Sequence, residues 1–244
     1  MPEISLLIPT KNNQNEIRDI ISNLNNVINH NSLIVETVII DNDSKDNTVK
    51  VAFDLAAQHP SLHIRVLSRK NLSNGFGSVI RFGLAFSKAD YCAVIQPDGS
   101  FPINLIPSFI SHLRNDCQLI QCNRYLSTEN NHKIEFKYKL SQYIYRAFIK
   151  LFLGLNISDS TFGFRAFNRV YIQALGLSSN GFSIFPEMTL KVIMSGGKVE
   201  YMPGVLNDQH DIKKEGFKLR NEIWGYVFVL IKCFFHRIKF INWY

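Results

Sequence analysis

The sequence has no apolar run long enough to span a bilayer and no recognisable export signal. Its most apolar stretch, residues 222–244, is interrupted by Lys232, and the uninterrupted part is shorter than the roughly 18–20 residues that a transmembrane helix needs. The chain opens MPEISLLIPT, with an acid at Glu3 and only a short apolar segment, which is not the pattern of a signal peptide. We therefore expect a cytoplasmic protein.

Cysteine pairs and nucleic-acid motifs are also lacking. The four cysteines form no CxxC pair, and Cys92 and Cys122 lie in apolar runs where small buried thiols are common, so we expect reduced cysteines. The net charge is +7, and residues 133–169 hold seven Lys or Arg against two acids. No signature of a nucleic-acid-binding fold accompanies this charge. The basic second half therefore indicates an anionic partner other than nucleic acid, or a solvated basic face.

Short apolar runs alternate with amphipathic segments through the first hundred residues. This pattern predicts strands at 3–9, 35–41, 62–68 and 91–96, and helices at 15–28, 46–58 and 77–89. Such alternation indicates parallel strands joined by crossover helices. With 244 residues, 46% of them hydrophobic, the chain suits one compact unit. We predict a single α/β domain with a Rossmann-like, mostly parallel sheet and flanking helices.

Beyond residue 100 the alternation loosens. The remaining elements are predicted as helices at 103–114, 135–153 and 185–195 and strands at 119–123 and 198–204. A change of role near residue 125 divides the domain, residues 1–244, into parts of about 1–125, 126–220 and 221–244. The last part is rich in aromatic and basic side chains, which suits an amphipathic helix in the headgroup layer of a membrane. A helix packed on the body of the protein, or on a second subunit of a homodimer, fits equally well.

Polar residues follow the first two predicted strands. Pro9, Thr10 and Asn12 come after the first, and the run from Asp41 to Thr48, which includes Asp43, comes after the second. In an open parallel sheet, ligands bind at the carboxyl ends of the strands, where an acid can accept hydrogen bonds from a ribose or a base. Ser44, Asp46 and Thr48 are equally suited to capping the next helix.

Two further loops carry candidate ligand contacts. Gly75 and Gly77 open a helix, whose first N–H groups could bind a phosphate, although a purely structural turn is the alternative. After the fourth strand comes Gln96-Pro97-Asp98, where an acid at the sheet edge could hold a divalent ion by its oxygen atoms.

Taken together, these loops resemble glycosyltransferase family 2. The run from Asp41 to Thr48 matches that family's D-D-x-S-x-D-x-T motif, the segment 74–83 resembles its N-x-G-x-G element, and Gln96-Pro97-Asp98 takes the place of its D-x-D motif. The resemblance extends to about residue 218. It implies a GT-A fold and transfer of a hexose from a GDP- or UDP-sugar with inversion.

Later motifs resemble the dolichol-phosphate mannose synthase-like subgroup. Asn123-Arg124-Tyr125 resembles its G-S-R-Y element, Lys137 and Ser141 fall on its R-x-x-x-S pair, and residues 159–167, 185–187 and 213–218 resemble its D-x-T-S-G-F-R, F-x-x-E and R-x-x-G-x-S-K elements. The resemblance implies catalytic roles for Asp98, Arg124, Asp159, Arg165 and Glu187; nucleotide-sugar contacts for Pro9, Thr10, Asn12, Asp41, Asp43, Gly75, Gly77, Gln96, Asp98, Lys213 and Lys218; and acceptor contacts for Arg124, Lys137 and Ser141. Parts 1–125 and 126–220 then become the nucleotide-sugar-binding and acceptor-binding halves.

Three positions depart from the family pattern. Lys11 stands where an aromatic residue is common, and Phe217 replaces the serine of the late loop. Gln96 replaces the first acid of D-x-D, and it offers a metal a neutral oxygen but no charge. The resemblance implies Mg²⁺ or Mn²⁺ held by Gln96 and Asp98. The glutamine predicts that metal affinity falls, or that the diphosphate is neutralised by other means.

The acceptor decides which residues the chemistry needs. A lipid phosphate is already ionised and needs cations such as Arg124, whereas a sugar hydroxyl needs a general base, for which Asp159 and Glu187 are candidates. We expect transfer to a polyprenyl phosphate by an enzyme peripheral to the inner face of a membrane. The alternatives are transfer to a hydroxyl of a growing surface glycan, and a non-catalytic relative that binds only nucleotide or lipid.

Overall fold

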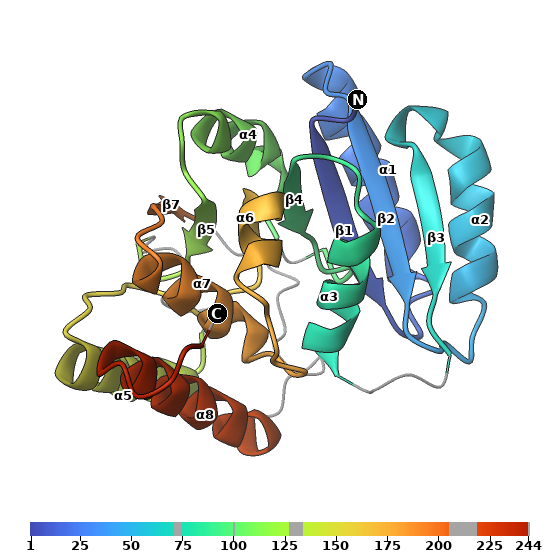
Figure 1. The fold of residues 1–244 in the computed structure, drawn as a ribbon. Helices are drawn as coiled ribbons and strands as arrows, with labels where there is room; N and C mark the ends of the chain where they lie inside the picture. Colours follow the sequence, from blue (N-terminus) through green and yellow to red (C-terminus); the bar gives the residue numbers. More distant parts are fainter. Residues whose placement is uncertain (71–74, 100, 127–133, 205–218, 244) are drawn as a thin grey trace.

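The computed structural model describes residues 1–70, 75–99, 101–126, 134–204 and 219–243. Its first half is a series of parallel strands with a helix after each of the first three. The elements are β1 (Ile4–Thr10), α1 (Glu16–His30), β2 (Val35–Asp41), α2 (Thr48–Gln58), a 3-10 turn (Pro60–Leu62), β3 (Ile64–Ser68), α3 (Phe76–Phe86) and β4 (Tyr91–Val94) (Figure 1). Every residue of β1 and β2 is buried, because helices cover both faces of the sheet. The predicted alternation is confirmed.

The second half is less regular. Its elements are a 3-10 turn (Ile103–Leu105), α4 (Ile106–Arg114), β5 (Leu119–Asn123), α5 (Phe136–Leu153), β6 (Arg165–Asn168), α6 (Arg169–Ala174), α7 (Ile184–Met194), β7 (Val199–Pro203) and α8 (Leu219–Arg237). The predicted helices and strands of this half are all present, but β6 and α6 were not expected. Four residues are too few to show a strand period, and β6 is recognisable only by its neighbours in the sheet.

One sheet of seven strands has the order β3-β2-β1-β4-β6-β5-β7. Strands β1 to β4 are parallel, β5 is parallel to β7, and β6 is antiparallel to both of its neighbours. The expectation of a mostly parallel sheet with flanking helices is therefore confirmed. Because β6 joins β4 to β5, it makes one continuous sheet of the two halves.

Separate apolar cores lie on the two faces of the sheet. One contains side chains of α1, α2 and α4, and the other contains side chains of α3, α6 and α7. A third cluster fills the space between α5, α7 and α8, and it includes Leu153, Leu190 and Cys233. All four cysteines are buried and none is in a disulfide, and burial raises the pKa of the Cys92 thiol to about 12. The expected reduced cysteines are confirmed.

Helices α5 and α8 lie side by side at the lower left of Figure 1, apart from the layers that cover the sheet. Their rings meet directly, with Tyr145 and Tyr226 packed edge to face at 5.5 Å between centroids. Among the described residues, no helix is both long and apolar enough to cross a bilayer.

Candidate active site

The carboxyl ends of β1 and β2 bring Thr10 and Asp41 opposite each other in the sheet. Asp41 is 2% exposed, and its Oδ2 accepts a hydrogen bond from the backbone N–H of Ser44 at 3.3 Å. Its Oδ1 is buried and accepts no hydrogen bond from the described residues. A buried carboxylate oxygen of this kind suits a hydroxyl or N–H group of a ligand, as expected for a ribose or base.

Hydrogen bonds join the loops that follow these two strands. The backbone N–H groups of Asn12 and Asn13 donate to the hydroxyls of Ser44 and Thr48 at 2.9 and 2.8 Å, and that of Gln14 donates to Asp46 at 3.2 Å. Ser44, Asp46 and Thr48 therefore tie one loop to the other, which goes beyond capping α2. Pro9 is buried at the end of β1, while Asp43 lies in the second loop and pairs with Lys45 at 2.9 Å.

Arg69 is a buried cation beside Asp41 that the sequence analysis missed. It is 3% exposed, its backbone N–H donates to the Asp41 carbonyl at 2.8 Å, and its guanidinium donates to Asn42 and Ser78 at 3.2 Å each. Burial lowers its pKa. A single arginine after a strand carries no periodic signal, so only the fold shows that it links β2 to the start of α3.

Gly75 and Gly77 are in contact with another part of the protein. A Cβ at Gly75 would lie 2.3 Å from the Asn180 carbonyl oxygen, and one at Gly77 would lie 2.5 Å from the Ser179 carbonyl oxygen. The Asn180 carbonyl also accepts the N–H of Ser78 at 3.2 Å. Close packing thus accounts for both glycines, in agreement with a purely structural turn. The N–H of Ser78, in the first turn of α3, already has a hydrogen-bond partner within the protein. Their contact with a phosphate stays a prediction.

A cavity of about 600 Å³ opens between the sheet and the pair α5 and α8. Its walls are mostly apolar or aromatic. The lining residues are Gln96, Arg124, Tyr138, Ser141, Gln142, Ile144, Tyr145, Phe148, Phe152, Leu153, Thr161, Phe162, Gly163, Phe182, Phe185, Ile223, Tyr226, Val227, Leu230, Ile231, Phe234 and Phe235. The few polar lining residues include Gln96, from the loop after β4, and Arg124, which follows β5. An apolar cavity with a cation in its wall suits a lipid that carries an anionic head.

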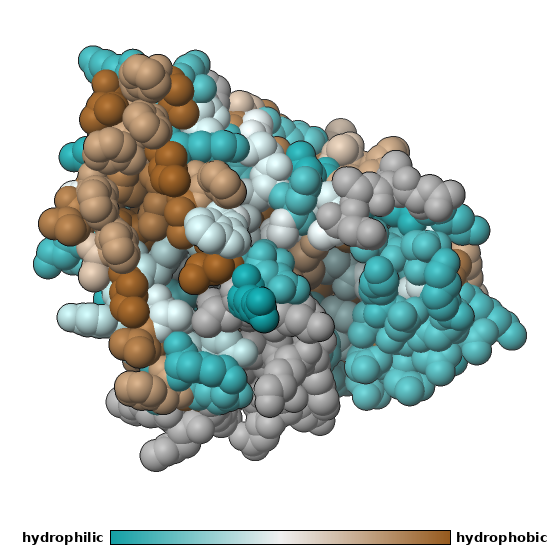
Figure 2. Space-filling model, turned by 90° about the horizontal axis from the view of Figure 1, so that it is seen from below, coloured by the Kyte–Doolittle hydropathy of each residue, from teal (hydrophilic) through white to brown (hydrophobic). Residues whose placement is uncertain are grey.

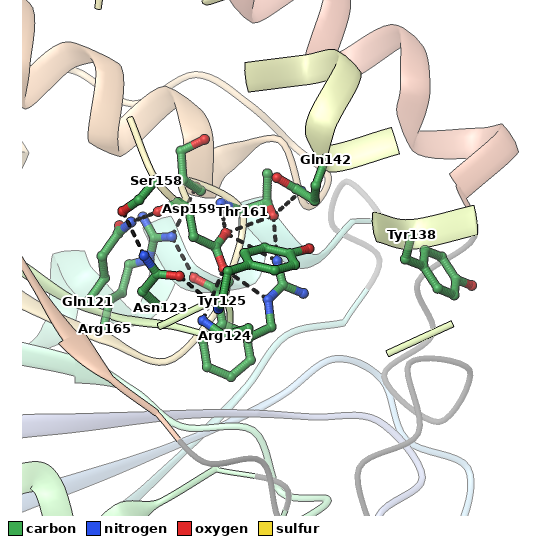
Figure 3. A network of polar contacts seen from close by, with 12 residues as sticks. Gln121, Asn123, Arg124, Tyr125, Tyr138, Gln142, Ser158, Asp159, Thr161 and Arg165 are labelled. Atoms are coloured by element: carbon green, nitrogen blue, oxygen red, sulfur yellow. Dashed lines mark hydrogen bonds and ion pairs between the residues drawn. The ribbon is translucent and has the colours of Figure 1, made fainter. Parts of the chain in front are cut away.

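Arg124 is held in place by Asp159 (Figure 3). Its Nε and Nη2 donate to the two carboxylate oxygens at 3.0 and 3.1 Å, and Nη2 also donates to the Thr161 hydroxyl at 2.8 Å. The ring of Phe162 lies 4.9 Å from the guanidinium. Burial would raise the pKa of the Asp159 carboxyl, but the charge and hydrogen bonds of Arg124 outweigh it and hold that pKa below its usual range.

The same contacts do not fit Asp159 as a general base. Asp159 is fully buried, and its Oδ1 also accepts the Thr161 N–H at 3.1 Å, so its lone pairs are used within the protein. Gln121, Asn123 and Gln142 complete the surrounding network, in which Gln142 of α5 donates to the Thr161 hydroxyl (Figure 3). We therefore assign Asp159 to positioning Arg124.

Arg165 does not reach the cavity, in contrast to its expected catalytic role. It is fully buried in β6, and its guanidinium donates to the carbonyls of Phe185, Ser160 and Phe162 at 2.8, 3.2 and 2.5 Å. Burial lowers its pKa to about 9. Because these donors point at backbone carbonyls, Arg165 holds the segment 160–162 against α7, and its contact with a departing diphosphate stays a prediction.

Glu187 likewise has a structural position. It is fully buried, its oxygens accept the N–H groups of Ser178 and Ser179 at 2.9 and 2.7 Å, and the Lys191 ammonium lies 3.3 Å away. Burial would raise its pKa, but the hydrogen bonds of Ser179 and Ser178 and the charge of Lys191 lower it. The expected role as a general base does not fit a carboxylate whose oxygens already hold a loop.

The remaining predicted residues are divided among three places. Ser141 lines the cavity, with its hydroxyl donating to the Tyr138 carbonyl at 2.9 Å. Lys137 is exposed, is not among the lining residues, and pairs with Glu135 at 2.6 Å. Lys213 and Lys218 lie outside the described residues.

A divalent metal would find only limited support from the described residues. They contain no group of three or more His, Cys, Asp or Glu side chains that could hold an ion. Asp98 is half-buried in the loop after β4 and could supply one carboxylate, which fits an ion bound mainly by substrate phosphates and water. Gln96 lines the apolar cavity instead.

Comparisons with known proteins agree with this geometry. The family model described as Glycosyl transferase family 2 matches residues 5–176. The chain is 28% identical over 191 residues to a dolichol-phosphate mannosyltransferase of Pyrococcus furiosus, and the match covers 78% of this chain and 53% of that protein. It is 24% identical over 177 residues to a dolichyl-phosphate beta-glucosyltransferase of Dictyostelium discoideum, covering 68% and 54%. The chain thus spans about half the length of these two relatives.

A third relative and a solved structure extend the comparison. An undecaprenyl-phosphate mannosyltransferase of Micrococcus luteus is 24% identical over 172 residues, with 69% of this chain and 70% of that protein covered. Glucosyl-3-phosphoglycerate synthase of Mycobacterium tuberculosis, solved with Mn²⁺, uridine diphosphate and phosphoglyceric acid, superposes with a TM-score of 0.66 at 16% identity, covering 99% and 80% of the two chains. The structural likeness confirms the expected GT-A fold.

Proposed function

Because the chain belongs to glycosyltransferase family 2, we propose that it transfers a hexose from a nucleoside-diphosphate sugar to a polyprenyl phosphate. The observation that carries the proposal is the apolar cavity between α5 and α8 with Arg124 in its wall. An isoprenoid chain would bury its surface there, and its phosphate would lie near the guanidinium. The relatives named for dolichyl and undecaprenyl phosphates support the same acceptor.

The transfer needs no general base. A phosphate oxygen of the acceptor attacks the anomeric carbon from the side opposite the leaving group, and the bond from that carbon to the diphosphate breaks. The nucleoside diphosphate leaves with the electron pair, the configuration inverts, and no proton is transferred. This chemistry agrees with the burial of Asp159 and Glu187, which leaves neither carboxylate available to a sugar hydroxyl.

Charge on the departing diphosphate must be balanced. A Mg²⁺ or Mn²⁺ ion would supply that balance when bound, and Asp98 is the residue that would hold it. Asp41, with its buried oxygen at the end of β2, would accept a hydrogen bond from the nucleoside.

The exposed apolar side chains of α5 and α8 support a position at the surface of a membrane. We call them the apolar ridge; they are Phe136, Leu140, Tyr143, Ile144, Phe148, Leu151, Phe152, Ile223, Trp224, Phe228, Ile231 and Phe235. Figure 2 shows hydrophobic side chains gathered along the side of the molecule that carries these helices, while the opposite side is hydrophilic. Because the same helices line the cavity, a lipid could enter it from the bilayer without crossing water.

Transfer of radiolabelled sugar tests the proposal. GDP-mannose, UDP-glucose and related donors are incubated with undecaprenyl or dolichyl phosphate, with and without Mg²⁺ or Mn²⁺. We expect a lipid-linked product that is lost in Asp98→Ala and retained in Asp54→Ala, an exposed acid of α2. Donor hydrolysis without a lipid product would instead favour a glycan acceptor, and the absence of both would favour a binding-only protein.

A further inference from the structure

Gln96 is nine-tenths buried and faces the acceptor cavity. It follows β4 at the carboxyl edge of the sheet, is 4% exposed, and lines the same cavity as Arg124, Phe162 and Phe185. It therefore lies between the edge where a nucleotide would bind and the apolar cavity between α5 and α8.

The carboxamide of Gln96 has an unmet requirement for hydrogen bonds. Its Oε1 is buried and receives no hydrogen bond from the described residues. A buried carbonyl oxygen without a donor is costly, so native proteins rarely keep one unless a ligand completes its bonding. An amide can also turn to present its NH₂ group in place of its oxygen, so it can donate as well as accept.

Charge distinguishes the ligands that this amide could meet. A carboxylate at position 96 would bring a negative charge into an apolar cavity, where its repulsion of an anionic head would be weakly screened. A neutral amide avoids that repulsion and offers N–H donors to phosphate oxygens. The glutamine is thus better suited to the acceptor phosphate than to a metal ion, which would favour the acid.

We propose that Gln96 is a specificity-determining residue for the acceptor. Its carboxamide, turned so that the NH₂ group faces the cavity that Arg124 also lines, donates a hydrogen bond to the phosphate of the lipid. The inference rests on the proposed polyprenyl-phosphate acceptor. It replaces the expectations that Gln96 is a metal ligand and a nucleotide-sugar contact, and it assigns Asp98 alone to the metal side.

Titration calorimetry of the full chain tests this role with two short-chain probes, farnesyl phosphate and the neutral alcohol farnesol. The variants are Gln96→Met, which keeps the size and removes the polar group, and Gln96→Glu, which keeps the shape and adds an acid. Loss of one hydrogen bond to a charged group should weaken farnesyl phosphate binding by about tenfold in Gln96→Met. Gln96→Glu should weaken it further, and farnesol should bind all three proteins equally.

Binding of a nucleoside diphosphate, with and without Mn²⁺, tests the alternative that Gln96 acts at the metal and nucleotide. We expect it to be unchanged in both variants. Equal farnesyl phosphate affinity in all three proteins would overturn the role of Gln96, as would tighter Mn²⁺-dependent nucleotide binding by Gln96→Glu. If the unmodified protein binds no farnesyl phosphate, the proposed acceptor itself is wrong. If thermal unfolding shows that Gln96→Glu does not fold, Gln96→Met carries the test.

Discussion

Asp159 and Arg124 form a nearly buried ion pair in the wall of an apolar cavity, with side-chain exposures of 0% and 11%. A pair of this kind adds little net stability, but removing one partner leaves an uncompensated buried charge. The bidentate geometry fixes the guanidinium at the place where an acceptor phosphate would bind. At the residue scale, Asp159 therefore holds and orients the Arg124 guanidinium.

Replacing Asp159 tests that dependence. Asp159→Ala should lower the free energy of unfolding by about 3–5 kcal/mol, because Arg124 then stays buried without a counter-charge. Denaturant unfolding measures the change. The matched control is Asp54→Ala, which removes an exposed acid of α2 and should leave the unfolding midpoint nearly unaltered. A similar small effect for both variants would contradict the proposed role of Asp159.

Glu222 gives a prediction about pH. Burial raises its pKa above the ordinary 4.5, although its carboxylate accepts the Phe182 N–H at 2.9 Å. Because the pKa of Glu222 is higher in the folded protein than in the unfolded chain, the folded state is favoured while Glu222 is protonated, below pH 4.5. This stability is lost as the pH rises through the folded-state pKa and the buried carboxyl ionises. Glu222→Gln keeps an acceptor for Phe182 and removes the charge. The stability of this variant relative to the parent should therefore increase from about pH 4 to about pH 7, measured by unfolding in urea at several pH values. A constant difference across this range would refute the assignment.

At the scale of elements, the loop 178–181 packs closely on the start of α3 and leaves no room for a Cβ atom at Gly75 and Gly77. Gly77→Ala would place a methyl group against the backbone oxygens of Ser179 and Gly181, at 2.5 and 2.7 Å, so one element must move. We expect a loss of about 2 kcal/mol or more in the free energy of unfolding.

A matched variant separates this clash from strain in the backbone alone. Gly176 has a φ of +59° and no atom within 4 Å of its would-be Cβ, so Gly176→Ala should cost only about 1–2 kcal/mol through conformation. Both are measured by denaturant unfolding. If Gly77→Ala proves harmless, the described contact with the 178–181 loop does not constrain α3.

The apolar ridge on α5 and α8 predicts which surface meets a bilayer. Leu151 and Trp224 are 78% and 67% exposed, and neither lines the cavity. Replacing both with aspartate should reduce vesicle binding about tenfold or more, because a charge in the apolar layer opposes insertion, while the unfolding midpoint stays near that of the parent. Phe53→Asp, on an exposed position of α2, should bind vesicles normally. Equal loss in both proteins, measured by vesicle sedimentation, would show that the ridge is not the contact surface.

At the scale of the whole molecule, one continuous sheet places the loops of both halves of the chain along the same structure. The loops after β1 and β2 carry residues expected to hold the nucleotide, whereas α5, α8 and the loops that follow β4 and β5 line the apolar cavity. Strand β6 joins the two halves of the sheet, so both substrates would meet along one edge. A net charge of +7 adds a general attraction to anionic surfaces.

This charge predicts a salt dependence of membrane binding. Vesicles that contain anionic lipid should bind the protein more tightly than neutral vesicles, and the difference should disappear in about 1 M salt, where the Debye length is about 3 Å. Binding that remains at high salt reports the apolar ridge. A preference for anionic vesicles that persists in high salt would contradict the electrostatic explanation.

The sequence by itself determined the order of the main elements and the family. Apolar runs and helical spacing mark β1 to β4 and their helices because each such segment buries a regular face, and this signal is local. The ordered motifs from Asp41 to Phe167 likewise needed no structure, since each is a short run of adjacent residues. The roles that the resemblance implied for Arg165 and Glu187 stay predictions, because both side chains make contacts within the protein and motif membership does not show which way a buried side chain points.

Only the tertiary structure decided how distant segments meet. The place of β6, the buried Arg69 beside Asp41, and the contact of Gly77 with Ser179 all depend on residues far apart in the chain, for which a single sequence carries no signal. The cavity is also of this kind, since it exists only where α5, α8 and the loop with Gln96 come together. The sequence determines which chemical groups the protein has, and tertiary packing determines which of them a substrate can reach.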